Sequence, residues 1–234
     1  MDPVTKYARD VTEGRIVAGH LARCACQRHL NDLERSKQRD YPWTFDPTRA
    51  ERVFQFYRFC RHVKGPLAGK SIELEPWQKF ILGSVFGWID KRTGHRRYRK
   101  AFVEVAAGNG KSTLLSGLAL YMLLADGEEG PEVYAAATKA EQARIVFNAA
   151  RRMAIRSPEL LRRLEPAKAR IECSLNGGVF RPLSRDDQQR GDGLAPHLAI
   201  IDEYHAHDTS EIYDVLSQSL PKRAQPLLFV ITTA

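Results

Sequence analysis

The sequence predicts an α/β fold in which a mostly parallel β-sheet is flanked by helices and preceded by a helical N-terminal arm. From residue 100 onward, short apolar segments alternate with longer segments of helical pattern, as in folds built from β-α-β units. The last two short segments are almost entirely apolar, which is typical of strands buried on both faces. The first 65 residues carry helical patterning interrupted by polar turns.

The N-terminal part contains two segments of helical pattern, residues 4–29 and 46–63. Residues 32–40 between them carry too much charge for a core, so they are expected to form a polar break. A turn rich in glycine and proline follows the second segment. We therefore expect a helical arm over residues 1–65 and an α/β domain over residues 66–234.

The second part follows the α/β pattern element by element. A helix is expected at residues 77–88, before the first core strand. The sequence then predicts strands at residues 100–105, 132–136, 197–202 and 226–232, and helices at residues 112–124 and 139–155.

Composition excludes several classes of protein. With 234 residues, 43% of them hydrophobic, the chain can build one full α/β core and a small helical appendage. No apolar run approaches the roughly 18 residues of a membrane span, and no secretory signal begins the chain, so a cytoplasmic protein without a membrane partner is expected.

Four scattered cysteines agree with a reducing compartment. Cys24 and Cys26 with His29 nearby leave a metal site open, with buried thiols as the alternative.

The basic excess favours a polyanionic partner. The chain has 36 basic and 28 acidic residues and a net charge of +8. Two stretches concentrate the basic residues: Lys91, Arg92, Arg96, Arg97, Arg99 and Lys100, and then Arg151, Arg152, Arg156, Arg162, Arg163, Lys168 and Arg170. We interpret them as a nucleic-acid footprint. Solvated helix faces are the alternative, because charge alone reads no sequence.

A glycine-rich segment between the first core strand and its helix has the features of a phosphate-binding loop. It reads Ala107, Gly108, Asn109, Gly110, Lys111, Ser112 and Thr113. Small residues let backbone N–H groups surround phosphates, Lys111 supplies a cation, and Ser112 offers a hydroxyl to magnesium. Val105 stands where the regular Walker A pattern has its first glycine, so this loop is a variant. A chance Gly-Lys-Ser turn is the alternative.

The apolar strand at residues 197–202 ends in two carboxylates, Asp202 and Glu203, which is a Walker B pattern. Asp202 is expected to hold a water of the magnesium shell, and Glu203 to polarise the water that attacks the γ-phosphate. Two solvent-facing acids at a strand end are the alternative. Together the two motifs predict a P-loop ATPase of the RecA-like (ASCE) type that binds ATP and Mg²⁺.

Two further motifs fit this class. Trp77-Gln78 lies upstream of the first core strand, where the glutamine amide can both donate to and accept from an adenine edge and the tryptophan can stack. Thr232 and Thr233 end the last strand, where hydroxyls can sense loss of the γ-phosphate and couple it to movement. An ordinary helix start and ordinary strand-end threonines are the respective alternatives.

The sequence resembles the large terminase subunit of tailed bacteriophages over nearly its whole length. The resemblance rests on Trp77-Gln78, the loop at residues 107–112, Tyr134-Ala135-Ala136-Ala137-Thr138 with Gln142-Ala143, Ser184-Arg185-Asp186, and Ile201-Asp202-Glu203-Tyr204-His205-Ala206. The N-terminal arm, with Gly19-His20-Leu21 and residues 26–33, is similar to the HK97-like branch.

The resemblance implies an ATP-driven motor that moves double-stranded DNA through a portal protein into a procapsid. It also implies a small terminase subunit as partner, a homo-oligomeric ring at the portal, a largely monomeric free chain, and the host cytoplasm as location. Family members carry a C-terminal nuclease domain, for which this chain has no room. Ala107 stands where they commonly have an arginine, so the arginine that neutralises the phosphate is not identified.

The resemblance also implies a trans-acting arginine finger at Arg190, because related terminases have an Arg-Gly pair in this region and Arg190-Gly191 occupies it. Residues 186–193 are polar and flanked by glycine, as a protruding mobile loop requires. A surface loop arginine is the alternative.

Two other functions share these motifs. A helicase-like, nucleic-acid-dependent ATPase would need strand-separating motifs, which the sequence lacks. A nucleotide-binding scaffold would hold ATP without releasing phosphate.

Overall fold

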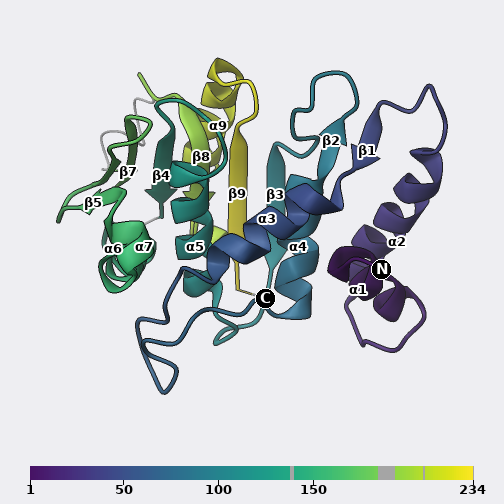
Figure 1. Ribbon diagram of the computed structural model, residues 1–234, viewed down its shortest axis with the longest axis horizontal. Coiled ribbons are helices and arrows are strands. Elements are labelled where there is room, and N and C mark those ends of the chain that lie inside the picture. The colour runs from purple at the N-terminus through teal and green to yellow at the C-terminus, as the bar shows by residue number, and fades with distance from the viewer. Residues whose placement is uncertain (138–139, 184–192, 208, 234) are drawn as a thin grey trace. The chain divides into compact units, whose positions relative to one another are not determined.

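The computed structural model of the chain describes residues 1–137, 140–183, 193–207 and 209–233 (Figure 1). The chain divides into two compact units. The first comprises Met1–Gln55 and Glu73–Tyr98, and the second comprises Phe56–Ile72 and Arg99–Ala234. The predicted division into an arm over residues 1–65 and an ATPase domain over residues 66–234 differs from these units and stays a prediction.

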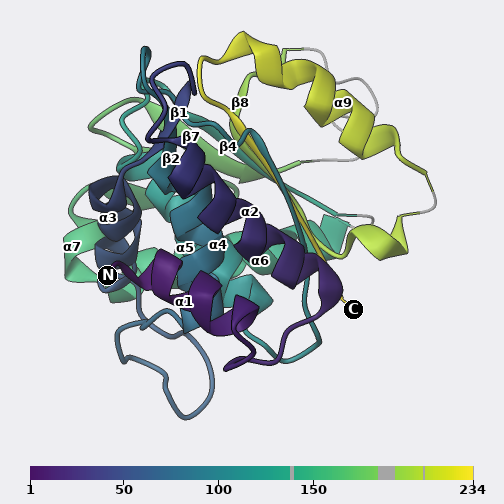
Figure 2. The same cartoon turned by 90° about the vertical axis from the view of Figure 1, so that its right-hand side faces the viewer.

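The first unit consists of helices and one small antiparallel sheet. Its elements are α1 (Pro3–Thr12), α2 (His20–Arg35), β1 (Trp43–Phe45), most of α3 (Pro47–Tyr57), α4 (Pro76–Gly87) and β2 (Trp88–Asp90). α1 packs against both α2 and α4, and β1 pairs with β2 (Figure 2). The predicted single helical segment 4–29 is therefore two helices. Gly14 adopts the left-handed conformation that ends the first of them, with φ of +78°.

The polar break expected at residues 32–40 does not begin at Asp32, because this residue is buried within α2. α2 continues through Asp32, whose side chain is buried. Arg97 contacts one carboxylate oxygen at 2.6 Å, and the Tyr41 hydroxyl donates to the other at 2.6 Å. A buried carboxylate is tolerated where a cation and hydrogen bonds compensate its lost hydration, so Asp32, the first residue of the charged segment, contributes to the core.

The same packing involves two residues of the predicted nucleic-acid footprint. Arg96 is 4% exposed and its guanidinium lies 5.0 Å from the centroid of the Phe86 ring. The Arg97 guanidinium forms an ion pair with Asp32 and lies over four surrounding aromatic rings. Because Arg96 is buried, it cannot reach DNA as expected, whereas the expected DNA contact of Arg97, 18% exposed and paired with Asp32, stays a prediction. Arg99 does remain exposed.

His29 is a core residue whose two ring nitrogens are both engaged. Nδ1 accepts from the Trp88 indole N–H at 3.0 Å, and Nε2 lies 3.1 Å from the Thr5 hydroxyl. Burial lowers the pKa of His29 to about 4 and raises the pKa of the Cys26 thiol to about 11. These contacts leave His29 unsuited to the metal site that the sequence left open.

A seven-stranded sheet forms the second unit. Its order is β3 (Lys100–Glu104), β9 (Leu227–Thr232), β8 (Pro196–Ile201), β4 (Glu132–Ala136), β7 (Gly178–Pro182), β6 (Ile171–Cys173) and β5 (Leu164–Pro166). The first five strands are parallel, and the last two extend the sheet antiparallel. The predicted mostly parallel sheet is therefore confirmed. The three short strands β5, β6 and β7 were not predicted.

Helices cover both faces of this sheet. They are α5 (Lys111–Leu124), α6 (Ala140–Arg156), α7 (Pro158–Leu161) and α9 (Glu211–Ser219), with short 3₁₀ turns η1 (Tyr204–Ala206) and η2 (Leu220–Lys222). α5 and α6 pack together on one face, and α9 lies on the other (Figure 2). None of the helices in the described ranges has the length and apolar character to cross a membrane.

Close packing fixes the position of α5, the helix that follows the phosphate-loop sequence. A Cβ atom at Gly117 would lie 2.3 Å from the Tyr57 ring, so only glycine permits this approach. The Tyr57 hydroxyl donates to the Leu114 carbonyl oxygen at 2.6 Å, and Tyr57 itself is fully buried. The N-terminus of α5, at Lys111, is thereby held in a defined place.

Candidate nucleotide site

Three parallel strands bring the predicted ATPase motifs to one edge of the sheet. β3 leads into the glycine-rich loop, β8 ends before Asp202 and Glu203, and β9 ends at Thr232. Because β9 pairs with β3 on one side and β8 on the other, its end lies between the two Walker motifs. Ligands of open α/β folds bind at the carboxyl ends of such strands.

The glycine-rich loop has the backbone that close approach to phosphate requires. Gly108 and Gly110 adopt φ of +81° and +75°, which only glycine enters freely. The Asn109 side chain donates to the Ala106 and Ala107 carbonyls at 3.1 and 3.4 Å. Residues 106–110 are exposed, so their backbone is open to a ligand.

Val105, at the position where the regular pattern has its first glycine, pairs with the end of β9. Its N–H donates to the Thr232 carbonyl at 3.1 Å. The position that regularly holds a glycine therefore extends the β3–β9 pairing by one residue, and a β-branched side chain suits this extended conformation.

Lys111, Glu203 and Thr233 form one hydrogen-bonded cluster. The Lys111 ammonium lies 3.4 Å from Glu203 Oε1 and donates to the Thr233 hydroxyl. The Thr233 hydroxyl and backbone N–H lie 2.7 and 3.2 Å from Glu203 Oε2. Lys111 is the first residue of α5 and is 9% exposed. A cation at a helix N-terminus beside the glycine loop is suited to bind phosphate.

Glu203 is held in an unusual backbone conformation. Its φ is +50°, and it is the one non-glycine residue with positive φ in the described part of the chain. For an L-residue this conformation costs about 1–2 kcal/mol, a cost often found at functional sites. Partial burial alone would raise the pKa of Glu203, but the hydrogen bonds from Thr233 and the charge of Lys111 outweigh it and lower this pKa. Glu203 is therefore ionised at neutral pH, as a group that polarises water must be.

Asp202 lies deeper than Glu203. It is 7% exposed, and its Oδ1 accepts from the Glu203 backbone N–H at 3.0 Å. Burial, followed by the charge of Glu203, raises the pKa of Asp202. A divalent cation would compensate this buried charge, with Asp202 acting through a water as predicted, and the Ser112 hydroxyl is an oxygen donor of the kind that Mg²⁺ prefers. These residues therefore fit the predicted metal role.

Thr232 carries a contact that the sequence did not suggest. Its hydroxyl oxygen lies 2.7 Å from Nδ1 of His205 and accepts from the His205 backbone N–H at 3.2 Å. Nδ1 is also 3.4 Å from Glu203 Oε2. His205 lies two residues after Glu203 in the Walker B segment, and this spacing was the one sequence signal that could have indicated a role for it.

The proposed adenine-binding pair lies in the first unit, on α4. Trp77 is half-buried and Gln78 is buried. The Gln78 side-chain oxygen accepts from the Glu75 backbone N–H at 2.9 Å and so caps the helix. A role for Trp77 and Gln78 in binding adenine stays a prediction.

Three predicted features lie wholly or partly outside the described residues. Arg190-Gly191, the proposed finger, and Ser184-Arg185-Asp186 fall within residues 184–192, and Thr138, the last residue of the motif that begins at Tyr134, falls within residues 138–139. The finger therefore remains a proposal from the sequence.

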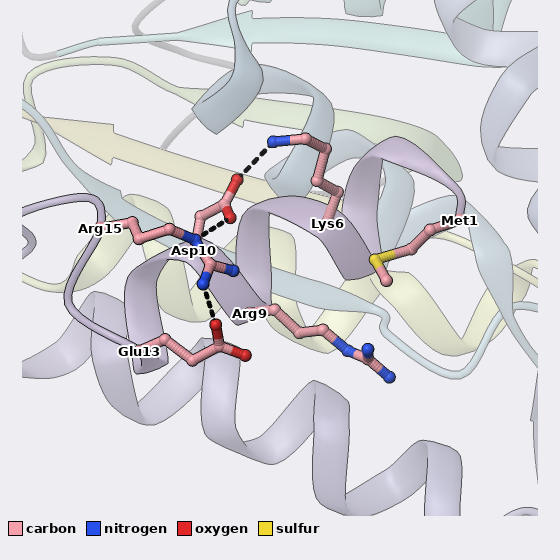
Figure 3. Close-up of a pocket in the computed structure, with 6 residues that line it drawn as sticks. All are labelled: Met1, Lys6, Arg9, Asp10, Glu13 and Arg15. Carbon is pink, nitrogen blue, oxygen red and sulfur yellow. Dashed lines mark hydrogen bonds and ion pairs between the residues drawn. The ribbon is translucent and has the colours of Figure 1, made fainter.

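A pocket on the first unit offers no competing catalytic site. It is lined by Met1, Lys6, Arg9, Asp10, Glu13 and Arg15 (Figure 3). Asp10 pairs with Lys6 at 2.6 Å and with Arg15 at 2.7 Å. Hydrogen bonds from Lys6 and Arg15 lower the pKa of Asp10. A carboxylate neutralised in this way is a poor base or metal ligand.

Comparison with known proteins identifies the family of this chain. The family described as "Terminase large subunit, ATPase domain" matches residues 76–234. The terminase large subunit of Enterobacteria phage HK97 is 30% identical over 195 residues, which cover 80% of this chain and 37% of that protein. Protein YmfN of Escherichia coli (strain K12) is 44% identical over 52 residues, 22% of this chain and 11% of that protein.

The crystal structure of the HK97 bacteriophage large terminase matches with a TM-score of 0.66 and 28% sequence identity, covering 79% of this chain and 37% of that one. The chain thus spans little more than a third of the length of this relative. Because the family match includes more than half of the chain, the chain belongs to the terminase large subunit family and carries its ATPase domain.

Proposed function

We propose that this chain is the ATPase motor domain of a DNA-packaging terminase, which couples ATP hydrolysis to translocation of double-stranded DNA into a procapsid. The observation that supports it most is the cluster of Lys111, Glu203 and Thr233, one residue from each motif at the ends of three parallel strands. ATP is the substrate. Portal protein, the small terminase subunit and a ring of identical subunits are the partners that the family resemblance adds to this proposal.

Hydrolysis at this site follows from an exchange of partners. Phosphate oxygens of ATP bind the loop amides and draw the Lys111 ammonium away from Glu203. The freed carboxylate then orients and polarises the attacking water, while Thr233 keeps it in place. Mg²⁺, held by Ser112 and through water by Asp202, would neutralise charge on the phosphates.

Lys111→Ala tests the phosphate site. Loss of a charge-assisted hydrogen bond to phosphate, worth about 1.5–3 kcal/mol, is expected to weaken ATP binding by roughly 10- to 100-fold. Calorimetric titration with ATP and magnesium measures the dissociation constant. Lys37→Ala, which removes an exposed lysine of the first unit, is the control and should bind as the wild type does. Unchanged ATP affinity in Lys111→Ala would place the phosphate site elsewhere.

An exposed basic surface on the second unit is the proposed contact for the DNA backbone. It lies at the end of α6, just after α7 and in the segment before β6, and it is formed by Arg152, Arg156, Arg162, Arg163, Lys168 and Arg170. Arg156 also donates to the His62 and Val63 carbonyls at 3.4 and 3.3 Å, which brings the segment 58–72 beside it. Arg151 instead turns toward the carbonyls of Pro166 and Ala167, each at 2.9 Å.

Salt dependence tests this surface. The wild type is expected to bind duplex DNA weakly, without sequence preference, and with an affinity that falls steeply as salt rises. Replacing both Arg162 and Arg163 with alanine should reduce the slope of log K against log salt by up to about 1.8, which is roughly 0.9 for each lost phosphate contact. Arg39→Ala, an exposed position of the first unit, is the control. An affinity independent of salt, or an equal effect of both variants, would refute the assignment.

A further inference from the structure

His205 contacts two groups on which the proposed reaction depends. Its ring Nδ1 lies 2.7 Å from the Thr232 hydroxyl oxygen and 3.4 Å from Glu203 Oε2. Its backbone N–H donates to the same Thr232 oxygen at 3.2 Å. His205 therefore links the turn after β8 with the end of β9.

Glu203 needs support from its neighbours. Its left-handed backbone is disfavoured for a residue with a Cβ atom, so surrounding contacts must hold it. In this structure Lys111, Thr233 and His205 surround its carboxylate. Once Lys111 turns to a phosphate, Thr233 and His205 are the two of these partners that remain to orient it.

The His205 side chain is poorly placed to stabilise the fold by packing. It is 54% exposed, and the 3₁₀ turn η1 to which it belongs has no buried residue. Thr232, in contrast, is 3% exposed within β9. The imidazole thus acts through its hydrogen bonds, and one ring nitrogen can donate to or accept from a hydroxyl.

We propose that His205 is a positioning residue, which holds the Glu203 carboxylate toward the attacking water and transmits its displacement to Thr232 on β9. This inference rests on the proposed hydrolysis of ATP at Glu203. In this proposal the His205 side chain connects the turn after β8, which carries Asp202 and Glu203, with β9, which ends at Thr232.

Two substitutions of His205 distinguish a role in positioning Glu203 from a purely structural role. His205→Ala removes the ring, whereas His205→Asn keeps a donor and an acceptor near the place of Nδ1. We expect kcat to fall about tenfold to a hundredfold in His205→Ala, since small misplacements of a reacting group have effects of this size. KM for ATP and the affinity for a non-hydrolysable ATP analogue should stay within about twofold, because the hydrogen bonds and ion pair described above join His205 to Thr232 and Glu203, which are not residues of the phosphate loop. His205→Asn should restore most of kcat.

The outcomes are distinct. A selective loss of kcat with rescue by asparagine supports the proposal. Wild-type kcat in His205→Ala, an equal loss of kcat and of analogue affinity, or failure of asparagine to improve on alanine overturns it. His20→Ala, a histidine exposed on α2 of the first unit, is the control for a general effect of removing an imidazole.

Hydrogen exchange of the Thr233 amide tests this inference independently of the proposed ATP hydrolysis. The Thr233 amide donates to Glu203 Oε2 at 3.2 Å, so its exchange reports how firmly Glu203 is held. If the wild type binds the analogue but releases no phosphate from ATP, the proposed hydrolysis fails. Faster exchange at Thr233 in His205→Ala would still support positioning by His205, and unchanged exchange would overturn it.

Discussion

Replacing Glu203 with glutamine is expected to abolish ATP hydrolysis while ATP binding is retained. The amide has the same shape and can still accept from Thr233, but it cannot polarise water as a carboxylate does. Removing a general base of this kind lowers the rate by about 10²- to 10⁴-fold. Because the variant also loses the ion pair with Lys111, the lysine is freed for phosphate, and ATP affinity should be unchanged or slightly higher.

Phosphate release and ATP binding, measured on the same preparation, check this result. Glu104→Gln is the matched control, because Glu104 is an exposed glutamate at the end of strand β3 of the same sheet. Its turnover should equal that of the wild type. Wild-type turnover in Glu203→Gln would refute the assignment of Glu203 as the catalytic carboxylate.

Arg190→Ala is expected to have an effect at least as large, but only between subunits. If Arg190 completes a neighbour's site, the free chain should hydrolyse ATP slowly, and activity per subunit should rise with protein concentration or on a portal ring. Arg190→Ala should abolish that rise, because arginine fingers contribute about 10³-fold or more to the rate. A surface arginine contributes far less. Turnover measured against protein concentration tests this expectation.

Mixing two inactive variants makes the test of Arg190 decisive. An Arg190→Ala protomer keeps an intact Glu203, and a Glu203→Gln protomer keeps Arg190. Where the two adjoin, the arginine of one can complete the site of the other, so activity should return on mixing. If none returns under conditions in which wild-type subunits assemble, Arg190 is a loop residue.

Much of the second unit could be predicted because its strands are buried on both faces. The predicted strands at residues 132–136 and 226–232 match β4 and β9 almost residue for residue. Continuous apolar character with turns on either side is a strong local signal. The phosphate loop and the Walker B carboxylates could be proposed for a similar reason, since their chemistry requires particular residue types directly after a strand.

The parts that sequence could not predict depend on contacts between distant residues. β7 carries a glycine and a proline, which weaken its strand signal, and its pairing with β4 and β6 makes it a strand. Asp32 reads as a surface residue until Arg97, 65 positions later, neutralises it. The role of Thr233 beside Lys111 and Glu203 follows from strand order, because β9 lies between β3 and β8 although it is last in the chain.

A structure of the chain with magnesium and a non-hydrolysable ATP analogue tests the central claim most directly, since the claim is that Lys111 and Glu203 exchange partners when ATP binds. We expect the phosphates on the amides of residues 107–112, the Lys111 ammonium within hydrogen-bonding distance of a phosphate oxygen, and the present 3.4 Å contact between Lys111 and Glu203 broken. A nucleotide bound away from this loop, or a bound nucleotide with Lys111 still paired to Glu203, would contradict the proposed ATPase site.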